Sequence, residues 1–334
     1  MKILVTGGCG FIGTNFVRLV YRARPDWEIV NLDKLTYAGN RSNLKDLEKS
    51  PRYRFVKGDI CSPSTALRAM RGCDYVAHFA AESHVDRSIL RPDEFLKTNV
   101  TGTMVLMRAA QEAGVKRFLH VSTDEVYGDI PAPAHSVESD PLWPNSPYAA
   151  SKAASDHLAR SFHRTYGLPV MVTRASNNFG PYQYPEKVLP LWITNLLEDD
   201  PIPMYGDGGQ VRDWLFVEDH ARALLLVLES GQPGEIYNVG GTRSCTNLEL
   251  AKGLLQALGK DAGLIRRVQD RPGHDRRYAL DCSKLKALGW KTETGFDAAL
   301  KLTVEWYKSH EEWWRRLKKK SAYKGYYKKQ YAKR

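Results

Sequence analysis

Short apolar runs alternate with amphipathic segments along the first half of the chain. The apolar runs are rich in β-branched residues, and each is followed by a segment with apolar positions at helical spacing. Strands are expected at residues 2–6, 28–33, 53–59, 74–80, 116–122 and 169–176, and helical segments at 11–22, 43–49, 64–70, 94–114 and 148–167. This alternation predicts an α/β fold in which helices cover both faces of a parallel, doubly wound sheet.

The pattern changes near Asn178. Loops rich in proline and glycine, at residues 179–187 and 199–210, separate the remaining helical segments, which predicts a smaller lobe that holds a ligand. One helix start is marked by the capping-box sequence Thr246–Glu249 ahead of an apolar run. We expect a first domain at residues 1–177, a partly interlaced ligand-binding lobe at 178–314, and a basic C-terminal tail at 315–334.

Composition limits the class of protein. With 334 residues and 43% hydrophobic content, the chain can bury a large core and is not typical of a disordered protein. No run approaches the roughly 18 apolar residues of a membrane span, and no signal-peptide core follows the first residues, so a cytoplasmic protein is expected. The five cysteines are scattered without C-x-x-C spacing, which argues against a disulfide framework and a metal site.

The formal net charge of +11 is concentrated at one end. Residues 310–334 contain ten Lys and Arg against two Glu, which leaves a net charge of +3 for the rest. A basic segment with interleaved tyrosines is able to bind RNA or an anionic surface, but a solvated or frayed terminus is the commoner outcome. Neither nucleic acid nor a membrane is therefore expected as a partner.

A glycine-rich turn, TGGCGFIG at residues 6–13, follows the first expected strand and opens a helix. It contains both G-x-G-x-x-G and G-x-x-G-x-x-G. Glycines are needed where the backbone approaches a pyrophosphate, whose charge the helix N-terminus stabilises. Asp33, at the end of the second strand, is placed to accept a hydrogen bond from a ribose 2′-hydroxyl and to repel a 2′-phosphate. NAD is therefore the expected cofactor, although Lys34 beside Asp33 weakens the preference over NADP.

Other strand ends extend this site, because ligands of open α/β sheets lie outside the carboxyl ends of the strands. Asp59 and Ile60 follow the third strand, and residues 80–84 follow the fourth. The expected cofactor contacts are Gly7, Gly10, Phe11, Ile12, Gly13, Asp33, Lys34, Leu35, Thr36, Asp59, Ile60, Ala80, Ala81, Glu82, Ser83, Ser122, Tyr148 and Lys152.

The sequence SPYAASK, residues 146–152, predicts a catalytic helix. Ser146 is a helix cap, Pro147 suits the first position, and Tyr148 and Lys152 then lie one turn apart on the same face. A phenol has a pKa of about 10, and lowering it by about three units requires roughly 4 kcal/mol of differential stabilisation. We expect Lys152 to lower this pKa and to hold the nicotinamide ribose. Tyr148 would then take a proton from an alcohol whose carbon gives hydride to NAD.

The chain resembles the extended short-chain dehydrogenase/reductase family in its glycine-rich turn, in STDEVYG (residues 122–128) and in SPYAASK. More narrowly, over residues 1 to about 310, it resembles the dTDP-glucose 4,6-dehydratases in STDEVYG, SNNFGPYQYPEK, RDWLFVEDHARAL, YNVGG and DRPGHDRRYALD. The resemblance implies a Rossmann domain, NAD as cofactor and dTDP-glucose as substrate. It also implies a homodimer formed by the helices that contain residues 100–114 and 154–167, whose apolar stripes could equally face the chain's own sheet.

The adjacent acids Asp124 and Glu125 are the most specific signal, since epimerases of the family generally lack them. Oxidation of C4 of a hexose makes the C5 hydrogen acidic, and loss of water then needs a base at C5 and an acid at C6. The resemblance implies that Glu125 is the base, that protonated Asp124 is the acid, and that Thr123 bonds the C4 oxygen beside Tyr148. The chain must then leave extended geometry after Ser122, because neighbouring strand residues face opposite sides. Two carboxylates this close should also resist ionising together.

Basic residues of the second half are candidates for binding a sugar-nucleotide diphosphate. Arg212, Arg271 and His274 match the family's contacts, and the fork of an arginine bonds two phosphate oxygens. The resemblance alone adds further residues: Thr98 and Asn178 near the cofactor, and His84, Asn177, Lys187, Val188, Pro203, Met204, Tyr205 and Asn247 near the substrate.

Rival functions predict other products. A UDP-sugar 4,6-dehydratase differs only in the base that it recognises. A sugar-nucleotide epimerase leaves the mass of its substrate unchanged, and a decarboxylase removes carbon dioxide. A non-catalytic NAD-binding protein need not keep Asp124, Glu125, Tyr148 and Lys152 together, and all four are present.

Overall fold

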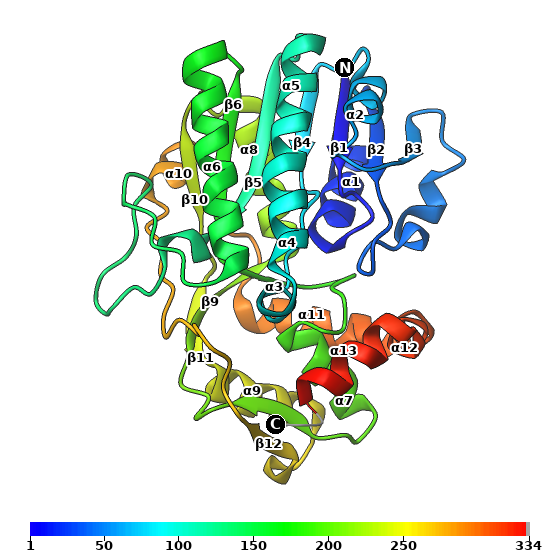
Figure 1. Cartoon of the computed structure of the whole chain (residues 1–334). Coiled ribbons are helices and arrows are strands. Elements are labelled where there is room, and N and C mark those ends of the chain that lie inside the picture. The colour runs from blue at the N-terminus through cyan, green and yellow to red at the C-terminus, as the bar shows by residue number, and fades with distance from the viewer. Residues whose placement is uncertain (332–334) are drawn as a thin grey trace.

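A parallel sheet of seven strands forms the centre of the larger lobe within residues 1–331, the part of the chain that the computed structural model describes (Figure 1). The strands lie in the order β10-β6-β5-β4-β1-β2-β3. Their bounds are β1 Lys2–Thr6, β2 Glu28–Asp33, β3 Tyr53–Lys57, β4 Tyr75–His78, β5 Arg117–Thr123, β6 Val170–Ala175 and β10 Ile236–Val239. The first six strands of the chain have the spatial order β3-β2-β1-β4-β5-β6 of dinucleotide-binding Rossmann folds, which confirms the expected fold class.

Helices cover both faces of this sheet, as the sequence pattern predicts. One face carries α1 (Phe11–Ala23), α8 (Val217–Ser230) and α10 (Ser283–Ala287), and the other carries α2 (Pro63–Met70), α5 (Thr103–Ala113) and α6 (Pro147–Tyr166). Phe16 and Val20 of α1 are fully buried with Leu224 and Leu228 of α8. Because both faces are covered, the strands are apolar along nearly their whole length.

Two of the expected helical segments take other forms. Residues 43–49 belong mostly to a 3₁₀ helix, η1 (Arg41–Leu47), and segment 94–114 divides into α4 (Pro92–Phe95), a π-helical stretch η2 (Leu96–Gly102) and α5; α3 (Val85–Leu90) precedes them. Asn99 in η2 accepts a hydrogen bond from the amide of Glu82 at 2.8 Å and donates one to Ser151 Oγ at 2.9 Å. A π-helical turn commonly re-aims side chains at a functional site.

The smaller lobe lies below the carboxyl ends of the central strands (Figure 1). Among the described residues it contains a sheet of order β11-β9-β7 and a parallel pair β12-β8. Trp192 and Trp214 are buried in its core, and the expected capping box is confirmed, since Thr246 Oγ1 accepts from the amide of Glu249 at 3.1 Å. The bounds are β7 Asn177–Phe179, α7 Val188–Leu197, β8 Ile202–Tyr205, β9 Val211–Phe216, β11 Arg243–Thr246, α9 Asn247–Leu258, η4 Ala262–Leu264, β12 Ile265–Val268 and α11 Phe296–Ser309.

The basic C-terminal segment is folded against the smaller lobe as far as Tyr331. Helices α12 (Glu311–Lys319) and α13 (Ser321–Tyr331) lie beside α7 and α11 (Figure 1). Trp314, Tyr323 and Tyr326 are buried. The expectation of a solvated or frayed end is therefore wrong for these residues, because the interleaved aromatic side chains form an apolar face that a count of charges overlooks. Residues 332–334 of the expected tail lie outside the described residues.

Two further observations concern the described chain as a whole. Every helix within residues 1–331 is too short or too polar to span a bilayer. The five cysteines carry free thiols.

Candidate active site

A cavity of about 300 Å³ opens at the carboxyl ends of the central strands. Its walls come from the turns after β1, β2, β4 and β5, from the start of α6 and from the loop around β7. Open α/β sheets bind their ligands at this edge. The cavity therefore lies where the strand-end residues of the sequence are expected to meet.

The turn between β1 and α1 leaves no room for a side chain at its glycines Gly7 and Gly8, nor does the start of α1 at Gly13. Gly7 has a φ of +73°, and a Cβ atom there would lie 2.7 Å from the amide nitrogen of Ala80. A Cβ at Gly13 would lie 2.3 Å from the carbonyl oxygen of Gly7. Since α1 begins at Phe11, its N-terminal amides face the same cavity. The turn has the form of a cradle for a pyrophosphate.

Asp33 ends β2 and lines the cavity. Its carboxylate accepts hydrogen bonds from the amides of Cys9 at 2.9 Å and Leu35 at 2.7 Å, while burial raises its pKa. Lys34 is ion-paired with Asp59 at 2.7 Å. The charge of Lys34 is therefore already matched by a carboxylate, which favours a ribose hydroxyl over a 2′-phosphate beside Asp33.

Thr123 is the last residue of β5, and the chain turns directly into the 3₁₀ helix η3 (Asp124–Tyr127). Thr123 Oγ1 accepts from the amide of Glu125 at 3.3 Å and donates to Asp124 Oδ1 at 3.2 Å. This turn allows Thr123 and both carboxylates to line one cavity. The expected departure from extended geometry is found one residue later than Ser122.

The two adjacent carboxylates have unequal surroundings. Asp124 is buried, and its Oδ2 atom has no hydrogen-bond partner among the described residues. Burial, and then the charge of Glu125, raise the pKa of Asp124 well above its ordinary value. Burial also raises the pKa of Glu125, but Arg271, Lys187 and Arg212 oppose that rise. Asp124 is therefore the carboxyl group that holds its proton more firmly.

Helix α6 brings Tyr148 and Lys152 to the cavity wall. As expected, Ser146 caps the helix by accepting from the amide of Ala149 at 3.1 Å. Lys152 Nζ donates to the carbonyl oxygen of Val121 at 2.8 Å. Burial, and then Glu125, raise the pKa of Tyr148, and the opposing influence is a hydrogen bond with Thr123. In this structure the carbonyl of Val121 holds the ammonium of Lys152, and the expectation that Lys152 lowers the pKa of Tyr148 stays a prediction.

Asp156 lies one turn beyond Lys152 on α6 and was missed in the sequence. Its Oδ2 accepts from Arg174 Nε at 2.9 Å, and Arg174 also donates to the hydroxyl of Tyr127 at 2.8 Å. Burial lowers the pKa of Lys152 to about 8, and the charge of Asp156 opposes this. Burial would raise the pKa of Asp156, but His120, whose Nε2 atom lies 3.4 Å from Oδ1, and the charge of Arg174 lower it to about 2. The spacing of four residues could have indicated that Asp156 lies on the same helix face as Lys152.

Nearly all of the expected cofactor residues line the cavity. They are Gly7, Gly10, Phe11, Ile12, Gly13, Asp33, Lys34, Thr36, Asp59, Ile60, Ala80, Ala81, Glu82, Ser83, Thr98, Ser122, Tyr148, Lys152 and Asn178. Leu35 does not line it, although its amide binds Asp33. The sequence analysis missed His220 on α8 and the loop positions Tyr37, Ala38, Gly39, Gly58, Gln183, Tyr184 and Glu186.

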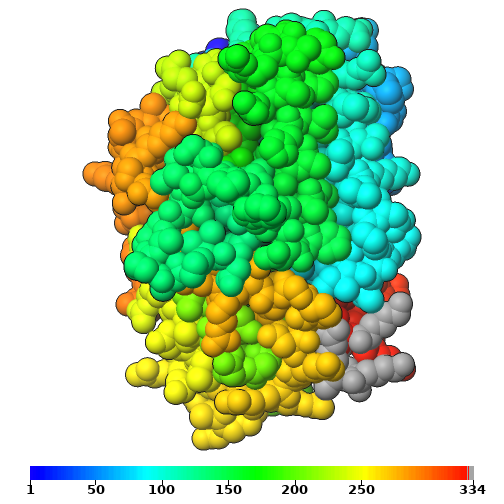
Figure 2. Space-filling view, turned by 60° about the vertical axis from the view of Figure 1, so that its left-hand side comes forward, coloured from blue at the N-terminus to red at the C-terminus, as the bar shows by residue number. Residues whose placement is uncertain are grey.

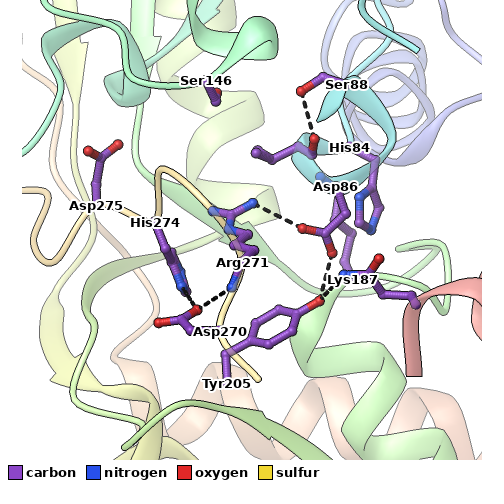
Figure 3. A network of polar contacts seen from close by, with 12 residues as sticks. His84, Asp86, Ser88, Ser146, Lys187, Tyr205, Asp270, Arg271, His274 and Asp275 are labelled. Carbon is purple, nitrogen blue, oxygen red and sulfur yellow. Dashed lines mark hydrogen bonds and ion pairs between the residues drawn. The ribbon is translucent and has the colours of Figure 1, made fainter. Parts of the chain in front are cut away.

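Three of the expected substrate residues line this cavity, and four others, His84, Tyr205, Arg271 and His274, belong to a polar network beside it. Thr123, Asn177 and Lys187 line the cavity, whereas His84, Val188, Pro203, Met204, Tyr205, Arg212, Asn247, Arg271 and His274 do not. Figure 3 shows Tyr205 and Arg271 directed toward Asp86, and His274 toward Asp270. The hydroxyl of Tyr205 donates to Asp86 Oδ2 at 2.8 Å, and His274 Nδ1 lies 2.6 Å from Asp270 Oδ1. Asp86 was missed because nothing in its sequence surroundings marks it.

A glycine cradle on a Rossmann sheet, with Tyr148, Lys152 and Thr123 lining one cavity, defines an extended short-chain dehydrogenase/reductase. The family model described as GDP-mannose 4,6 dehydratase matches residues 4–303. A dTDP-glucose 4,6-dehydratase of Streptomyces niveus is 50% identical over 323 residues, covering 95% of this chain and 96% of the relative. The dTDP-glucose 4,6-dehydratase 1 of Escherichia coli K12 is 49% identical over 341 residues, covering 94% of each.

Solved structures agree with these sequence comparisons. The crystal structure of DesIV, a dTDP-glucose 4,6-dehydratase from Streptomyces venezuelae with NAD and TYD bound, superposes with a TM-score of 0.93 at 52% identity, covering 95% of this chain and all of that one. A Thermus thermophilus UDP-glucose 4-epimerase complex with NAD gives a TM-score of 0.85 at 33% identity, covering 93% of this chain and all of the epimerase. The chain belongs to the dTDP-glucose 4,6-dehydratase family.

Proposed function

We propose that this protein removes water from dTDP-glucose to give dTDP-4-keto-6-deoxyglucose, with NAD as its resident cofactor. One observation carries the proposal: the turn Thr123–Glu125 places a hydroxyl and two unequal carboxyl groups in the same cavity as Tyr148 and Lys152. An epimerase needs the hydroxyl and the phenol, but has no use for an acid and a base at neighbouring carbons. The names of the relatives point to the same substrate.

The cavity suits NAD, because an added Cβ at Gly7 or Gly13 would fill the space against the backbone and Asp33 ends the neighbouring strand. The amides at the start of α1 would hold the pyrophosphate, and Asp33 would accept from the adenosine ribose. Lys152 would donate to the nicotinamide ribose. When bound, NAD would accept a hydride from C4 of the sugar and return it to C6, so that no cofactor is consumed.

Proton transfer at O4 is the task of Tyr148. Its phenolate would take the proton of the C4 hydroxyl as the C4 carbonyl forms, and Thr123 would donate a hydrogen bond to the same oxygen. Burial raises the pKa of Tyr148, so the phenolate that acts as the base needs a neighbouring positive charge to stabilise it. The positive charge of Lys152, held in place by Val121, would stabilise the phenolate while the proton is transferred.

Elimination across C5 and C6 is the task of the two carboxyl groups. Once C4 is a ketone, Glu125 would take the C5 proton, and Asp124 would give its own proton to the departing C6 oxygen. Water leaves, and a C5–C6 double bond conjugated to the ketone remains. The unpartnered Oδ2 of Asp124 and the raised pKa of its carboxyl group support its role as the acid. The hydride would then be returned to C6 and a proton to C5.

The remaining substrate would extend toward the smaller lobe. Arg271, Arg212 and His274 would meet the diphosphate, and Arg271 and Arg212 already stabilise the negative charge of Glu125. Tyr205, His84, Val188, Pro203, Met204 and Asn247 would border the nucleoside, while Asn177 and Lys187 would reach the sugar from the cavity wall.

The test is a mass measurement on purified protein incubated separately with dTDP-glucose and UDP-glucose. A product lighter by one water from dTDP-glucose alone supports the proposal. Water loss from UDP-glucose with equal or greater efficiency would make the protein a UDP-sugar 4,6-dehydratase. A product of unchanged mass with inverted C4 would make it an epimerase, and release of NAD without any turnover would support a binding protein.

Assembly and location complete the proposal. We place the enzyme in the reducing cytoplasm, which suits its free thiols. A homodimer through α5 and α6 is supported by exposed Leu90 and Leu96, with 54% and 55% of their surfaces accessible, on the elements next to those helices. Figure 2 shows the outer surface of α6 beside the segment that contains these leucines. Changing both leucines to glutamate should halve the mass measured by light scattering.

A further inference from the structure

Helix α13 reaches the substrate end of the site. Tyr326 is buried, and its hydroxyl donates to Asp86 Oδ2 at 3.0 Å. Four residues later on the same helix face, Gln330 donates to the hydroxyl of Tyr205 at 2.6 Å. The proposed function uses Tyr205 but gives no role to α13. A basic C-terminal helix thus touches the residues that surround the nucleotide part of the substrate.

Asp86 is the centre of these contacts. It belongs to α3 of the larger lobe, whereas Tyr205 and Arg271 come from two separate segments of the smaller lobe (Figure 3), and Tyr326 belongs to α13. Its Oδ2 accepts from both tyrosine hydroxyls, and its Oδ1 lies 3.5 Å from Arg271 Nη1. Burial opposes ionisation, but the charges of His84 and Arg271 and the two hydroxyl bonds lower the pKa of Asp86. Asp86 is therefore a buried carboxylate whose charged form is stabilised by its hydrogen-bond donors and by Arg271.

Asp86 in turn fixes the guanidinium of Arg271. That group is planar and offers five N–H donors in a rigid fork, so one held nitrogen sets the direction of the others. The Nε atom of Arg271 is buried and has no hydrogen-bond partner among the described residues. A phosphate oxygen is a suitable acceptor for such a donor.

We propose that Tyr326 is a positioning residue for recognition of the substrate diphosphate, acting through Asp86 on Arg271 and Tyr205. The inference rests on the proposed function only for the identity of the ligand. Tyr326 touches Asp86 and lies 3.4 Å from His84 Nε2. Without its hydroxyl, Asp86 keeps one phenol donor, and the carboxylate is free to turn toward Arg271. The arginine would then be neutralised by Asp86 and less available to the diphosphate.

The substitution Tyr326→Phe separates this role from a structural one. The phenyl ring keeps its place under the guanidinium of Arg87, 4.7 Å from the ring centroid, and against His84, so only the hydroxyl is lost. The matched control is Tyr323→Phe on the same helix, whose hydroxyl donates to the carbonyl of Pro185 at 3.4 Å. A structural role predicts similar loss of stability in both variants.

The experiment measures turnover of dTDP-glucose, the Kd for dTDP by calorimetry, the bound NAD content and the thermal midpoint. We expect Tyr326→Phe to raise KM and Kd about tenfold, the effect of losing one hydrogen bond to a charged group, with kcat within about twofold and NAD content unchanged. Gln330→Ala should raise KM in the same direction, and Tyr323→Phe should leave KM and Kd at their wild-type values.

Two results would overturn the inference: an unchanged KM and Kd in both Tyr326→Phe and Gln330→Ala, or a fall in kcat and thermal midpoint with KM unchanged. Wild-type protein that binds dTDP but makes no product would count against the proposed function instead. In that case the comparison of Kd values still decides whether Tyr326 positions Arg271.

Discussion

The guanidinium of Arg174 on β6 donates from Nε to Oδ2 of Asp156 on α6 at 2.9 Å, and both side chains are buried. Asp156 lies one helical turn beyond Lys152, on the same face of α6. The negative charge of Asp156 helps Lys152 to remain protonated against its burial. The ion pair therefore links the core of the larger lobe to the ammonium of Lys152, for which we propose a catalytic role.

Asp156→Asn should move the alkaline limb of the kcat profile to lower pH. Burial already lowers the pKa of Lys152 to about 8, and loss of the neighbouring carboxylate removes an influence that raises it. Lys152 then loses its proton, and with it the charge that stabilises the phenolate, at a lower pH. Leaving Arg174 without its partner should also cost about 3–5 kcal/mol of the free energy of unfolding.

The matched control for that variant is Tyr127→Phe, which removes the hydroxyl that Arg174 donates to but leaves Asp156 in place. It should lower stability and keep the wild-type pH profile. Profiles of kcat with dTDP-glucose, each measured well below the thermal midpoint of the variant, decide the matter. An alkaline limb that stays in place in Asp156→Asn would contradict the proposed link.

Glu125→Gln should stop proton removal at C5 while sparing the first step. The amide cannot accept the C5 proton, so kcat should fall by about 10²–10⁴-fold. Slow reduction of bound NAD, seen by absorbance, should persist, whereas exchange of the C5 hydrogen with solvent deuterium should be lost. Unimpaired exchange would remove Glu125 from its role as the base.

Asp124→Asn should give the opposite pattern and serves as the control for Glu125→Gln. The base remains, so C5 exchange with deuterium should continue, but the C6 oxygen receives no proton and water loss should fall by about 10²–10⁴-fold. Reduced cofactor should accumulate during turnover. Parallel loss of exchange and elimination in both variants would show that the carboxyl groups do not divide the two tasks.

Gly13→Ala should prevent the glycine-rich turn from binding NAD. Its Cβ would lie 2.3 Å from the carbonyl oxygen of Gly7, which is backbone and cannot swing away. The bound NAD content of the purified protein should fall sharply. Gly253→Ala is the control, since nothing lies within 4 Å of its Cβ on helix α9. That variant should keep its NAD and gain about 0.5–1 kcal/mol of stability.

Trp314→Ala should test whether α12 belongs to the core. The indole is fully buried and donates from Nε1 to the carbonyl of Tyr307 at 2.9 Å, so truncation should cost about 3–5 kcal/mol of the free energy of unfolding. Trp143→Ala removes an indole that is 72% exposed and should change stability by less than about 0.5 kcal/mol. Equal urea midpoints for the two variants would contradict a folded C-terminal segment.

Six strands of the central sheet could be predicted from the sequence because each is a short apolar run, whereas β10 (Ile236–Val239) was missed because it lies among the segments of the smaller lobe. The cofactor residues could be predicted for a related reason: a parallel sheet brings every strand end to one edge, so Gly13, Asp33 and Asp59 converge although they are distant in sequence. The π-helical stretch around Asn99 could not be predicted, because its apolar spacing also fits an ordinary helix.

Contacts between segments that share no sequence pattern could not be predicted from the sequence. Asp86 and Tyr326 are separated by most of the chain, and neither belongs to a recognisable motif. Local charge suggested a solvated end near Tyr326, while burial of the aromatic residues decided the structure. The raised pKa of Tyr148 was missed for a similar reason: burial and Glu125 act in three dimensions, whereas the spacing to Lys152 is visible in the sequence.

The strand β10 completes the central sheet beside β6, yet it follows β7, β8 and β9 along the chain. A fragment that stops at residue 177 would lack β10 and also α8, which packs on α1. In the whole protein the edge of β6 pairs with residues 236–239. Without them, the backbone groups of β6 would be unpaired and able to bind a strand of another molecule. A protein truncated after residue 177 should therefore aggregate. The nucleotide-binding lobe needs the later segments of the chain in order to fold stably.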